Sequence, residues 1–345
     1  MKKLVNHSFF ILILFILFIL QNAVSQQDSS NFEGIIVSNE AYVNYIDHEP
    51  ITINSNDDFI TYGFSGNGTG DNPYIIENYR IIANAEYGIK ICCIDKSYII
   101  KNCYIDLDYN TTTYGIYLQD SPEYCSILNN TCTDNYFGLY LNHCTRMVVA
   151  NNTLNANTKG LYALNSNHMD IIQNNCYDCD LLGFDFYDCI WIDITLNQLT
   201  YNYQDALKLH YTQDSLICLN TFVGNDGYAV FLSSQTHDNE VYLNNFVDNA
   251  ELLTSQAYDS GTDNYWYNQL NLQGNFWSDL EYLCYYELDG TAGSFDLYPL
   301  NRDADCYTTS IPSTSTSTPF AFEMLVISLV LLILVNKIKI VKKRE

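Results

Sequence analysis

Three charged residues near the middle of the chain, Asp185, Asp188 and Lys208, have side chains that could carry acid–base chemistry. Hydrolysis of a glycosidic bond uses two carboxyl groups about 5–9.5 Å apart, and elimination from a sugar acid uses a base, often Lys or Arg. We expect the two aspartates on one strand and Lys208 one coil above Asp185. These residues are the catalytic candidates. The alternative is a solvated cross-strand ion pair without a catalytic role.

Two columns of outward-facing residues are expected beside these candidates. Counted from a small residue that recurs about every 23 positions, the second residue is Lys90, Tyr117, Tyr140, Tyr162, Asp185, Lys208 and Phe231, and the fourth is Cys92, Gln119, Asn142, Leu164, Tyr187, His210 and Ser233. Sugar rings stack on aromatic faces and offer hydroxyls to polar groups beside them. We therefore expect Tyr117, Tyr140, Tyr162, Tyr187 and His210 to contact a linear glycan. The alternative is that the stacked tyrosines only stabilise the sheet.

An internal repeat defines the elements that must position these side chains. The small residue recurs at Gly88, Gly115, Gly138, Gly160, Gly183, Ala206 and Ala229, and asparagines recur in phase at Asn102, Asn130, Asn152, Asn175, Asn197, Asn220 and Asn244. Each unit contains short apolar stretches of period two, and no stretch keeps the 3.6-residue period of a helix. Three positions before each asparagine stands a β-branched residue, typical of an inward-facing strand position: Ile99, Ile127, Val149, Ile172, Ile194, Ile217 and Val241.

Three short strands per unit predict an all-β fold, a parallel β-helix with about seven regular coils over residues 80–251. Stacked coils place equivalent residues above one another at the strand spacing of ~4.8 Å. A β-sandwich is the structural alternative, but it would show tight Asn-Gly hairpin turns instead of asparagines in phase. The atypical flanks, residues 26–79 and 252–306, are expected to cap the open ends of the solenoid.

The two ends of the chain predict export and a membrane anchor. Residues 1–25 combine a basic start, an apolar run and small residues before position 26, as in a signal peptide; a retained N-terminal anchor is the alternative. Residues 307–319 are rich in Ser, Thr and Pro and predict a stalk. Residues 320–336 predict a single transmembrane helix in the cell membrane, and the basic tail 337–345 is expected in the cytoplasm, which leaves the body outside.

The charge of the exported body is strongly negative. The chain has 15 Lys and Arg and 40 Asp and Glu; seven of the cations and two of the acids lie in the terminal segments, so the body keeps 8 and 38, a net charge of about −30. Such a charge argues against nucleic acid as a partner. No cofactor is indicated; calcium is the cation that an acidic surface would favour, although acidity alone makes no calcium site.

Twelve cysteines in an exported protein would suggest disulfides, but several, such as Cys132 and Cys218, fill apolar positions of the repeat. Cys284 and Cys306, outside the repeats, are the best candidate pair. A lone CxxC at residues 176–179 has no second pair, which argues against a zinc site.

Four sequons could carry N-linked glycans. Asn67 and Asn110 fall in expected loops and are the predicted glycosylation sites. Asn129 and Asn151 adjoin the asparagine column, so we expect them to be partly buried.

Three motifs resemble those of NosD-like proteins, the right-handed β-helix family with carbohydrate-binding and sugar-hydrolase (CASH) repeats. They are GFSGNGTGDNPYIIE at residues 63–77, GNFWSD at 274–279 and GTAGSFDLYPL at 290–300. The resemblance spans about residues 50–300 and implies a right-handed solenoid. The stalk, apolar segment and basic tail resemble the anchoring end of archaeal S-layer-associated surface proteins.

The family takes its name from a periplasmic protein implicated in copper delivery, but this role is not expected here. A copper site needs converging His, Met or Cys side chains, and the histidines of the body are expected to be scattered surface residues. The chain also departs from the family between residues 277 and 290. Where the family has an Asp- and Gly-rich stretch that could bind calcium, only Asp279, Glu281, Glu287 and Asp289 remain.

Two functions from different classes fit these observations. The favoured one is a non-enzymatic surface protein whose partner is a polysaccharide or an envelope glycoprotein. The alternative is a polysaccharide lyase, hydrolase or epimerase that acts on the outer face of the solenoid. Three or more carboxylates converging in a cleft on the strands after the recurring glycine would favour the enzyme.

Overall fold

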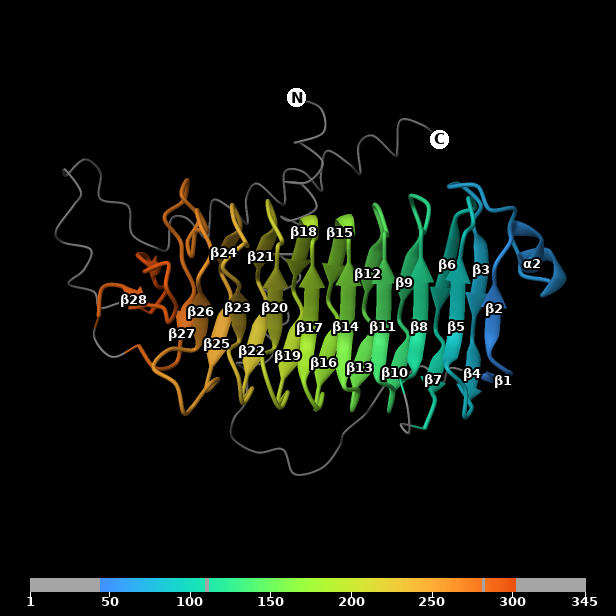
Figure 1. Ribbon diagram of the computed structural model, residues 1–345, viewed down its shortest axis with the longest axis horizontal. Coiled ribbons are helices and arrows are strands. Elements are labelled where there is room, and N and C mark those ends of the chain that lie inside the picture. Colours follow the sequence, from blue (N-terminus) through green and yellow to red (C-terminus); the bar gives the residue numbers. More distant parts are fainter. Residues whose placement is uncertain (1–43, 109–111, 281–282, 302–345) are drawn as a thin grey trace, which may run out of the picture. The chain divides into compact units, whose positions relative to one another are not determined.

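The computed structural model describes residues 44–108, 112–280 and 283–301, and these form a parallel β-solenoid with three strands per coil (Figure 1). Three parallel sheets run side by side along the solenoid, and successive strands of one sheet come from successive coils. The all-β parallel β-helix predicted from the repeat is confirmed. We name the sheets A, B and C.

Sheet A has ten strands, and it follows the asparagine corner of each coil. Its strands are β1 (Ile46–Asp47), β4 (Tyr79–Ile82), β7 (Tyr104–Asp106), β10 (Thr131–Thr133), β13 (Thr153–Asn155), β16 (Asn175–Tyr177), β19 (Gln198–Thr200), β22 (Thr221–Val223), β25 (Asn245–Val247) and β27 (Phe276–Trp277).

Sheet B has nine strands, and it contains the recurring small residue. Its strands are β2 (Ile51–Ile53), β5 (Tyr87–Cys92), β8 (Tyr114–Gln119), β11 (Phe137–Asn142), β14 (Lys159–Leu164), β17 (Leu182–Tyr187), β20 (Leu207–His210), β23 (Val230–Leu232) and β26 (Ala257–Asp259).

Sheet C has eight strands and ends at the asparagine corner. Its strands are β3 (Tyr74–Glu77), β6 (Tyr98–Lys101), β9 (Ser126–Leu128), β12 (Val148–Ala150), β15 (Asn167–Ile172), β18 (Ile190–Thr195), β21 (Leu216–Cys218) and β24 (Glu240–Tyr242). The solenoid therefore has about eight turns, because its sheets continue into both flanks that the sequence assigned to caps.

Inward-facing residues form one continuous core. Both inward residues after each recurring small residue are fully buried, as predicted; Leu139 and Leu141 are examples. The β-branched column is also buried, but two of its members are Ile100 and Ile171 rather than the predicted Ile99 and Ile172. These two coils each have two adjacent isoleucines at this place, so the sequence pattern fits either register.

A ladder of buried asparagines hydrogen-bonds the backbone groups of the turns between sheets C and A. Asn174 shows the arrangement: its Nδ2 donates to the Val149 carbonyl (2.9 Å) and to Asn197 Oδ1 (3.0 Å), and its Oδ1 accepts from the backbone N–H of Asn152 (3.0 Å). The ladder consists of Asn130, Asn152, Asn174, Asn197, Asn220, Asn244 and Asn275. The predicted members Asn102 and Asn175 are wrong by one residue, and Cys103 takes the first place.

A small residue is required at the recurring glycine position because adjacent coils approach closely there. A Cβ on Gly138 would lie 2.6 Å from the carbonyl oxygen of Gly160 on the next coil. Later coils have alanine at this position, at Ala206 and Ala229, and both are buried. This requirement keeps the column in phase along the chain and fixes where each strand of sheet B begins.

Aromatic residues close both ends of the core. At the N-terminal end, Phe59 of helix α2 (Asn56–Thr61) stacks on Tyr74 with ring centroids 4.5 Å apart. At the C-terminal end, Trp277 stacks between Phe246 (4.1 Å) and Tyr286 (3.9 Å). Beyond it, β28 (Tyr286–Glu287) and β29 (Phe295–Asp296) form an antiparallel pair. The open ends of the sheets are thereby covered.

Most cysteines within the repeats serve as apolar core residues, whereas Cys93 is exposed and Cys92 lies in an outward column. Ten cysteines of the described residues are free, and Cys132 and Cys218 are buried as expected. Cys284 is disulfide-bonded. Its predicted partner Cys306 lies outside the described residues. The described residues contain no helix long and apolar enough to cross a membrane, and the expected signal peptide, stalk, transmembrane helix and tail all fall outside them.

Candidate functional site

The outer face of sheet B carries the predicted columns in the predicted register. Backbone pairing aligns Lys90, Tyr117, Tyr140, Tyr162, Asp185, Lys208 and Phe231 on successive coils. The second column aligns Cys92, Gln119, Asn142, Leu164, Tyr187 and His210 in the same way. These alignments follow from the alternation of side chains along a strand, once the recurring small residue fixes the phase.

A third outward column, which the sequence reasoning missed, lies on the other side of the first. It consists of the residues immediately before the recurring glycines: Tyr87, Tyr114, Phe137, Lys159 and Leu182. Strict alternation counted back from Tyr140 would place the residue before each glycine inward. Each strand instead has two consecutive buried residues, such as Gly138 and Leu139, which shift the alternation by one position and turn Phe137 outward.

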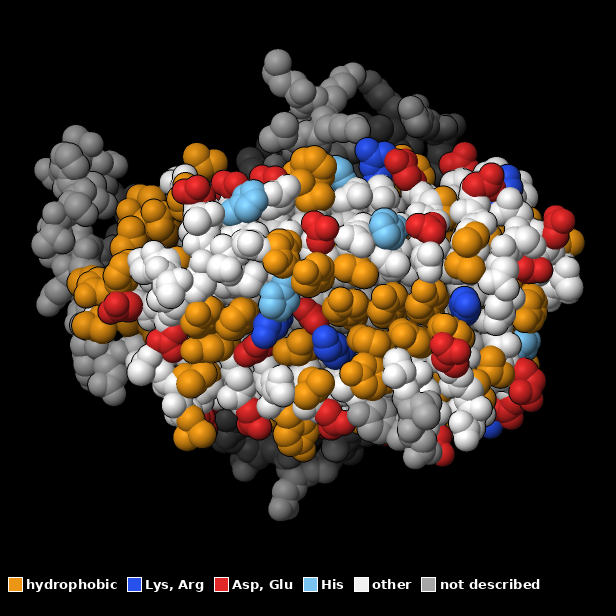
Figure 2. Space-filling view, viewed as in Figure 1, with side chains coloured by type: hydrophobic (Ala, Val, Ile, Leu, Met, Phe, Trp, Pro, Cys, Tyr) orange, Lys and Arg blue, Asp and Glu red, His pale blue; other side chains and the backbone are white. Residues whose placement is uncertain are grey.

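Two aromatic columns pack against each other to form what we call the aromatic patch: Tyr87, Tyr114, Phe137, Tyr117, Tyr140 and Tyr162. Within a column, Tyr117 and Tyr140 stack with centroids 5.0 Å apart, and between columns Tyr114 and Tyr140 meet edge to face at 5.2 Å. These contacts stabilise the sheet, as the alternative interpretation predicts. Every ring is nevertheless only half-buried, so edges and hydroxyls remain accessible. Figure 2 shows the patch as a band of hydrophobic side chains along this face.

A compact group of charged residues, the charged cluster, follows the aromatic patch. Lys159 Nζ lies 2.6 Å from Asp185 Oδ2, and Lys208 Nζ lies 3.3 Å from Asp205 Oδ2. The side chain of Asp185 is 6% exposed and that of Lys159 is 20% exposed. Other lysine and arginine ion pairs of the described residues have side chains 34–80% exposed. The cluster is thus shielded from water, where an ion pair is stronger than at an open surface.

This pairing corrects the arrangement expected from sequence. Lys208 does stand one coil above Asp185, but its ion pair is with Asp205, and Asp185 bonds Lys159 of the preceding coil. Lys159 belongs to the missed column, and its long side chain reaches diagonally to Asp185. Asp188 is not on the strand: it follows β17 in an exposed turn with φ 54°.

Lysines of the cluster also lie on aromatic rings. Lys159 Nζ is 4.9 Å from the centre of the Tyr162 ring, and Lys208 Nζ is 4.3 Å from that of Phe231. Lys90 lies at the opposite end of the patch, 4.6 Å from the centre of Tyr87. Cation–π contacts of this kind hold an ammonium group in place without neutralising it.

His210 and Tyr187 lie at the edge of the cluster, with ring centroids 5.9 Å apart. Burial lowers the pKa of His210, and Lys208 and Lys159 lower it further, while Asp185 opposes them. His210 is therefore neutral near pH 7. Burial raises the pKa of Tyr162 to about 12, and the nearby Asp185 carboxylate adds to this shift. The phenol consequently remains a hydrogen-bond donor at any physiological pH.

One oxygen of the cluster lacks a partner. Asp185 Oδ1 is buried and accepts no hydrogen bond from the described residues, whereas Oδ2 accepts from Lys159. An unpaired buried acceptor costs about 1–3 kcal/mol. Two aspartates lie in the cluster, each paired with a lysine, and among the described residues no three acidic, histidine or cysteine side chains converge there.

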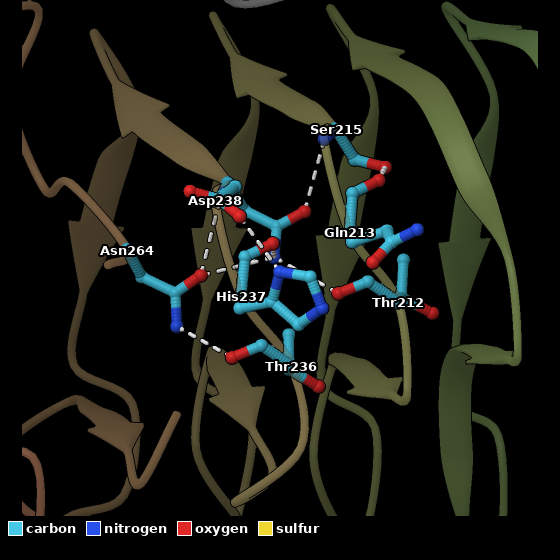
Figure 3. Close-up of polar contacts among 8 residues, drawn as sticks. Thr212, Gln213, Ser215, Thr236, His237, Asp238 and Asn264 are labelled. Carbon is cyan, nitrogen blue, oxygen red and sulfur yellow. Dashed lines mark hydrogen bonds and ion pairs between the residues drawn. The ribbon is translucent and has the colours of Figure 1, made fainter. Parts of the chain in front are cut away.

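The histidines do not fit a copper centre. Among the described residues no three His, Cys, Asp or Glu side chains converge on one point. His237, for example, contacts Asp238 at 2.7 Å, and its other neighbours in Figure 3 are neutral: Thr212, Gln213, Ser215, Thr236 and Asn264. Cys176 and Cys179 bring two sulfur atoms within 3.5 Å, but both are buried in the closed core, and burial raises the pKa of Cys176.

The acidic residues near the C-terminal end are engaged by protein donors. Asp279 accepts hydrogen bonds from Gln256 Nε2 (2.6 Å) and the Tyr286 hydroxyl (2.8 Å), and Asp289 accepts from the Tyr228 hydroxyl (3.2 Å). Glu287 is exposed, and Glu281 lies outside the described residues. These contacts stabilise the closing segment and leave no set of oxygens from the described residues arranged around a calcium ion there.

Three of the four sequon asparagines belong to the described residues. Asn67 is exposed in a loop, as expected, and its Oδ1 accepts from the Thr69 hydroxyl at 2.8 Å. Asn110 lies outside the described residues. Asn129 and Asn151 are exposed rather than partly buried. They adopt left-handed φ angles of 55° just before the ladder residues Asn130 and Asn152, which turns their side chains outward.

Several solved structures are similar to this chain at low identity. A point mutant of the periplasmic alginate epimerase AlgG is 15% identical with a TM-score of 0.48, covering 57% of this chain and 48% of that one. The Azotobacter vinelandii mannuronan C-5 epimerase AlgE4 A-module is 13% identical (TM-score 0.42; 53% and 59% covered), and the Dettilon tailspike protein is 12% identical (0.38; 67% and 61%). The chain thus spans about half the length of the first. At these scores the similarity says nothing about function.

The sequence itself places the chain in a family. A comparison with curated protein sequences finds no match. Residues 20–282, well over half of the chain, match the profile of the family described as periplasmic copper-binding protein (NosD). With its phased repeat and parallel solenoid, the chain belongs to the NosD family.

Proposed function

We propose that this protein is a non-enzymatic protein of the cell envelope that binds a polysaccharide or an envelope glycoprotein on the outer face of sheet B. The observation that supports this proposal is the aromatic patch beside a shielded charged cluster. Tyrosine combines a large apolar area with a polar tip and few rotatable bonds, so its burial by a ligand costs little conformational entropy. Contiguous exposed apolar surface of this kind is typical of interaction sites.

The role of each predicted residue follows from its position. Tyr140 and Tyr162 lie in the middle of the face and would supply apolar contact through their edges. Tyr187 and His210 border the charged cluster and would offer a hydroxyl and a neutral imidazole. Asp185 and Lys208 would bind hydroxyl or charged groups rather than transfer protons, because each already has an ion-pair partner.

Removing two central tyrosines is expected to weaken binding strongly. The full-length protein would be tested by affinity electrophoresis against a panel of neutral and acidic polysaccharides. Tyr140→Ala combined with Tyr162→Ala should weaken retention at least tenfold, or about 1.4 kcal/mol, with the solenoid still folded. Tyr201→Ala combined with Tyr203→Ala is the matched control, because these tyrosines are 61% and 60% exposed and lie outside the patch.

Two outcomes of this assay would contradict the proposal. Equal retention by the Tyr140/Tyr162 variant would exclude the aromatic patch as the binding face. Shortening of the glycan by the wild type, abolished by Asp185→Asn without loss of binding, would establish the enzymatic alternative with Asp185 as a catalytic residue.

We also propose that the body is held at the outer surface of the cell membrane by the apolar segment 320–336, after export directed by residues 1–25. The support is the order of apolar, Ser/Thr-rich and basic segments in the sequence. Protease added to intact cells should cleave within 307–319, while a tag placed after Glu345 should be protected. Accessibility of that tag from outside would reverse the orientation.

A further inference from the structure

Cations are scarce on this protein, yet three lysines lie on the outer face of sheet B. The body carries a net charge of about −30. The other four cations of the described residues, Arg80, Lys96, Lys101 and Arg146, lie away from this face in exposed ion pairs with acidic neighbours. Lys90, Lys159 and Lys208 instead bracket the aromatic patch. Acidic residues of the same face, Asp185, Asp205 and Glu86 beside Tyr87, offset these lysines, so the face is far less negative than the body as a whole.

The bracketing lysines keep hydrogen-bonding capacity. An ammonium group has three donors, and Lys208 forms an ion pair with Asp205 at 3.3 Å. Lys90 lies over the rings of Tyr87 (4.6 Å) and Tyr117 (5.7 Å) and has no ion pair within the described part of the chain. Aromatic contacts orient both ammonium groups while leaving donors free for a further acceptor.

Asp185 does not compete for the free donors of these lysines. Its Oδ2 is paired with Lys159, which neutralises the carboxylate. Its Oδ1 is buried and closed to solvent, so the lysines, not this oxygen, face a ligand.

We propose that the ligand of this face is an anionic polysaccharide, whose carboxylate or sulfate groups bind Lys90 and Lys208. This inference rests on the proposed carbohydrate-binding function. Lys90 and Lys208 stand five coils apart in one column, which is ~24 Å at a strand spacing of ~4.8 Å. An extended chain with repeated negative charges spans that length along the tyrosines, whereas a single sugar does not.

The overall charge of the body gives the proposal a distinctive salt dependence. At long range the acidic body repels a polyanion, and at contact the lysines attract it. Raising the ionic strength from about 0.01 M to 0.15 M shortens the screening length from about 30 Å to 8 Å. The association rate with a polyanion should therefore rise over this range, and affinity should fall only near 1 M salt. A neutral glycan should show neither effect.

The test compares polygalacturonate, dextran sulfate and neutral dextran as probes for the full-length protein. We expect at least one polyanion to bind at least tenfold more tightly than dextran, and the two polyanions separate carboxylate from sulfate recognition. Lys90→Met should weaken polyanion binding at least fivefold, and Lys90→Arg should restore it. Lys208→Met should act in the same direction, and Lys96→Met combined with Lys101→Met, away from the face, should have no effect.

The outcomes distinguish this inference from the function on which it rests. If dextran binds as tightly as both polyanions, the proposal of an anionic ligand is wrong, while the proposed carbohydrate binding still stands. Polyanion binding that Lys90→Met does not change, in a variant with the wild-type melting temperature, would also overturn it. Binding of none of these probes, nor of any glycan in the wider panel, would overturn both.

Discussion

Replacing Ile171 by aspartate should destabilise the solenoid by about 4 kcal/mol or more, while the same change at Ile172 should cost about 1 kcal/mol or less. Ile171 is fully buried, between Val149 and Ile194 of the adjacent coils. A carboxylate there would have no ion-pair partner and no water. Ile172 points outward from the same strand, so its replacement stays in contact with solvent.

Urea unfolding followed by circular dichroism measures this difference as a shift in midpoint. Ile171→Val is the conservative control and should cost about 0.5–1.5 kcal/mol. If Ile171→Asp fails to fold, the yield of soluble protein replaces the midpoint as the readout. The yield should then be lost for Ile171→Asp and retained for Ile172→Asp. Equal midpoints for the two aspartate variants would show that the register of sheet C is wrong.

Replacing Asn174 by alanine should cost roughly 3–5 kcal/mol, because several buried backbone groups lose partners at about 1–3 kcal/mol each. The Val149 carbonyl would lose its donor, and the backbone N–H of Asn152 would lose its acceptor. Asn175→Ala is the matched control and should change stability by about 0.5 kcal/mol or less, because its side chain is half-exposed.

The same urea titration distinguishes these two asparagine variants. Because adjacent coils depend on one another in a solenoid, loss of one ladder residue should lower the midpoint of the whole transition. A larger effect at Asn175 than at Asn174 would contradict the ladder. Hydrogen exchange adds a local readout: the amide of Asn152 should exchange faster in Asn174→Ala and be unchanged in Asn175→Ala.

The core and the ladder matter for the proposed function because they position the outer face of sheet B, which we propose as the binding face. Each column on sheet B is regular because its strands keep their register, while loops between the sheets take up differences in coil length, such as 27 residues from Gly88 to Gly115 and 22 from Gly138 to Gly160. The buried asparagines and the close glycine contacts support that register, so Lys90, the tyrosines and Lys208 are held in line before any ligand arrives. Such preorganisation lowers the entropic cost of binding.

Spacing along the chain was sufficient to predict the architecture. The recurring glycine and asparagine indicated three parallel strands per coil, the inward pairs of sheet B and the outward columns with Tyr140, Asp185 and Lys208. From the residue after the glycine onward the side chains alternate, so one fixed residue per coil determines the side of the residues that follow it in that strand. The column with Lys159 was not available from this rule, because the consecutive buried residues Gly160 and Leu161 interrupt the alternation.

Two kinds of feature could be assigned only from the tertiary structure. They are the contacts between different columns and the choice between two adjacent residues of the same type. Ile171 and Ile172, like Asn174 and Asn175, fit the repeat equally well by type, and only packing in three dimensions selects which one is buried. Asp185 pairs with Lys159 rather than Lys208 because the Lys159 side chain extends diagonally from one column to the next. The spacing of residues along the sequence carries no information about such a contact. The unpaired Asp185 Oδ1 is likewise a property of all the surrounding side chains together, because burial and hydrogen bonding are decided by neighbours that are distant in sequence.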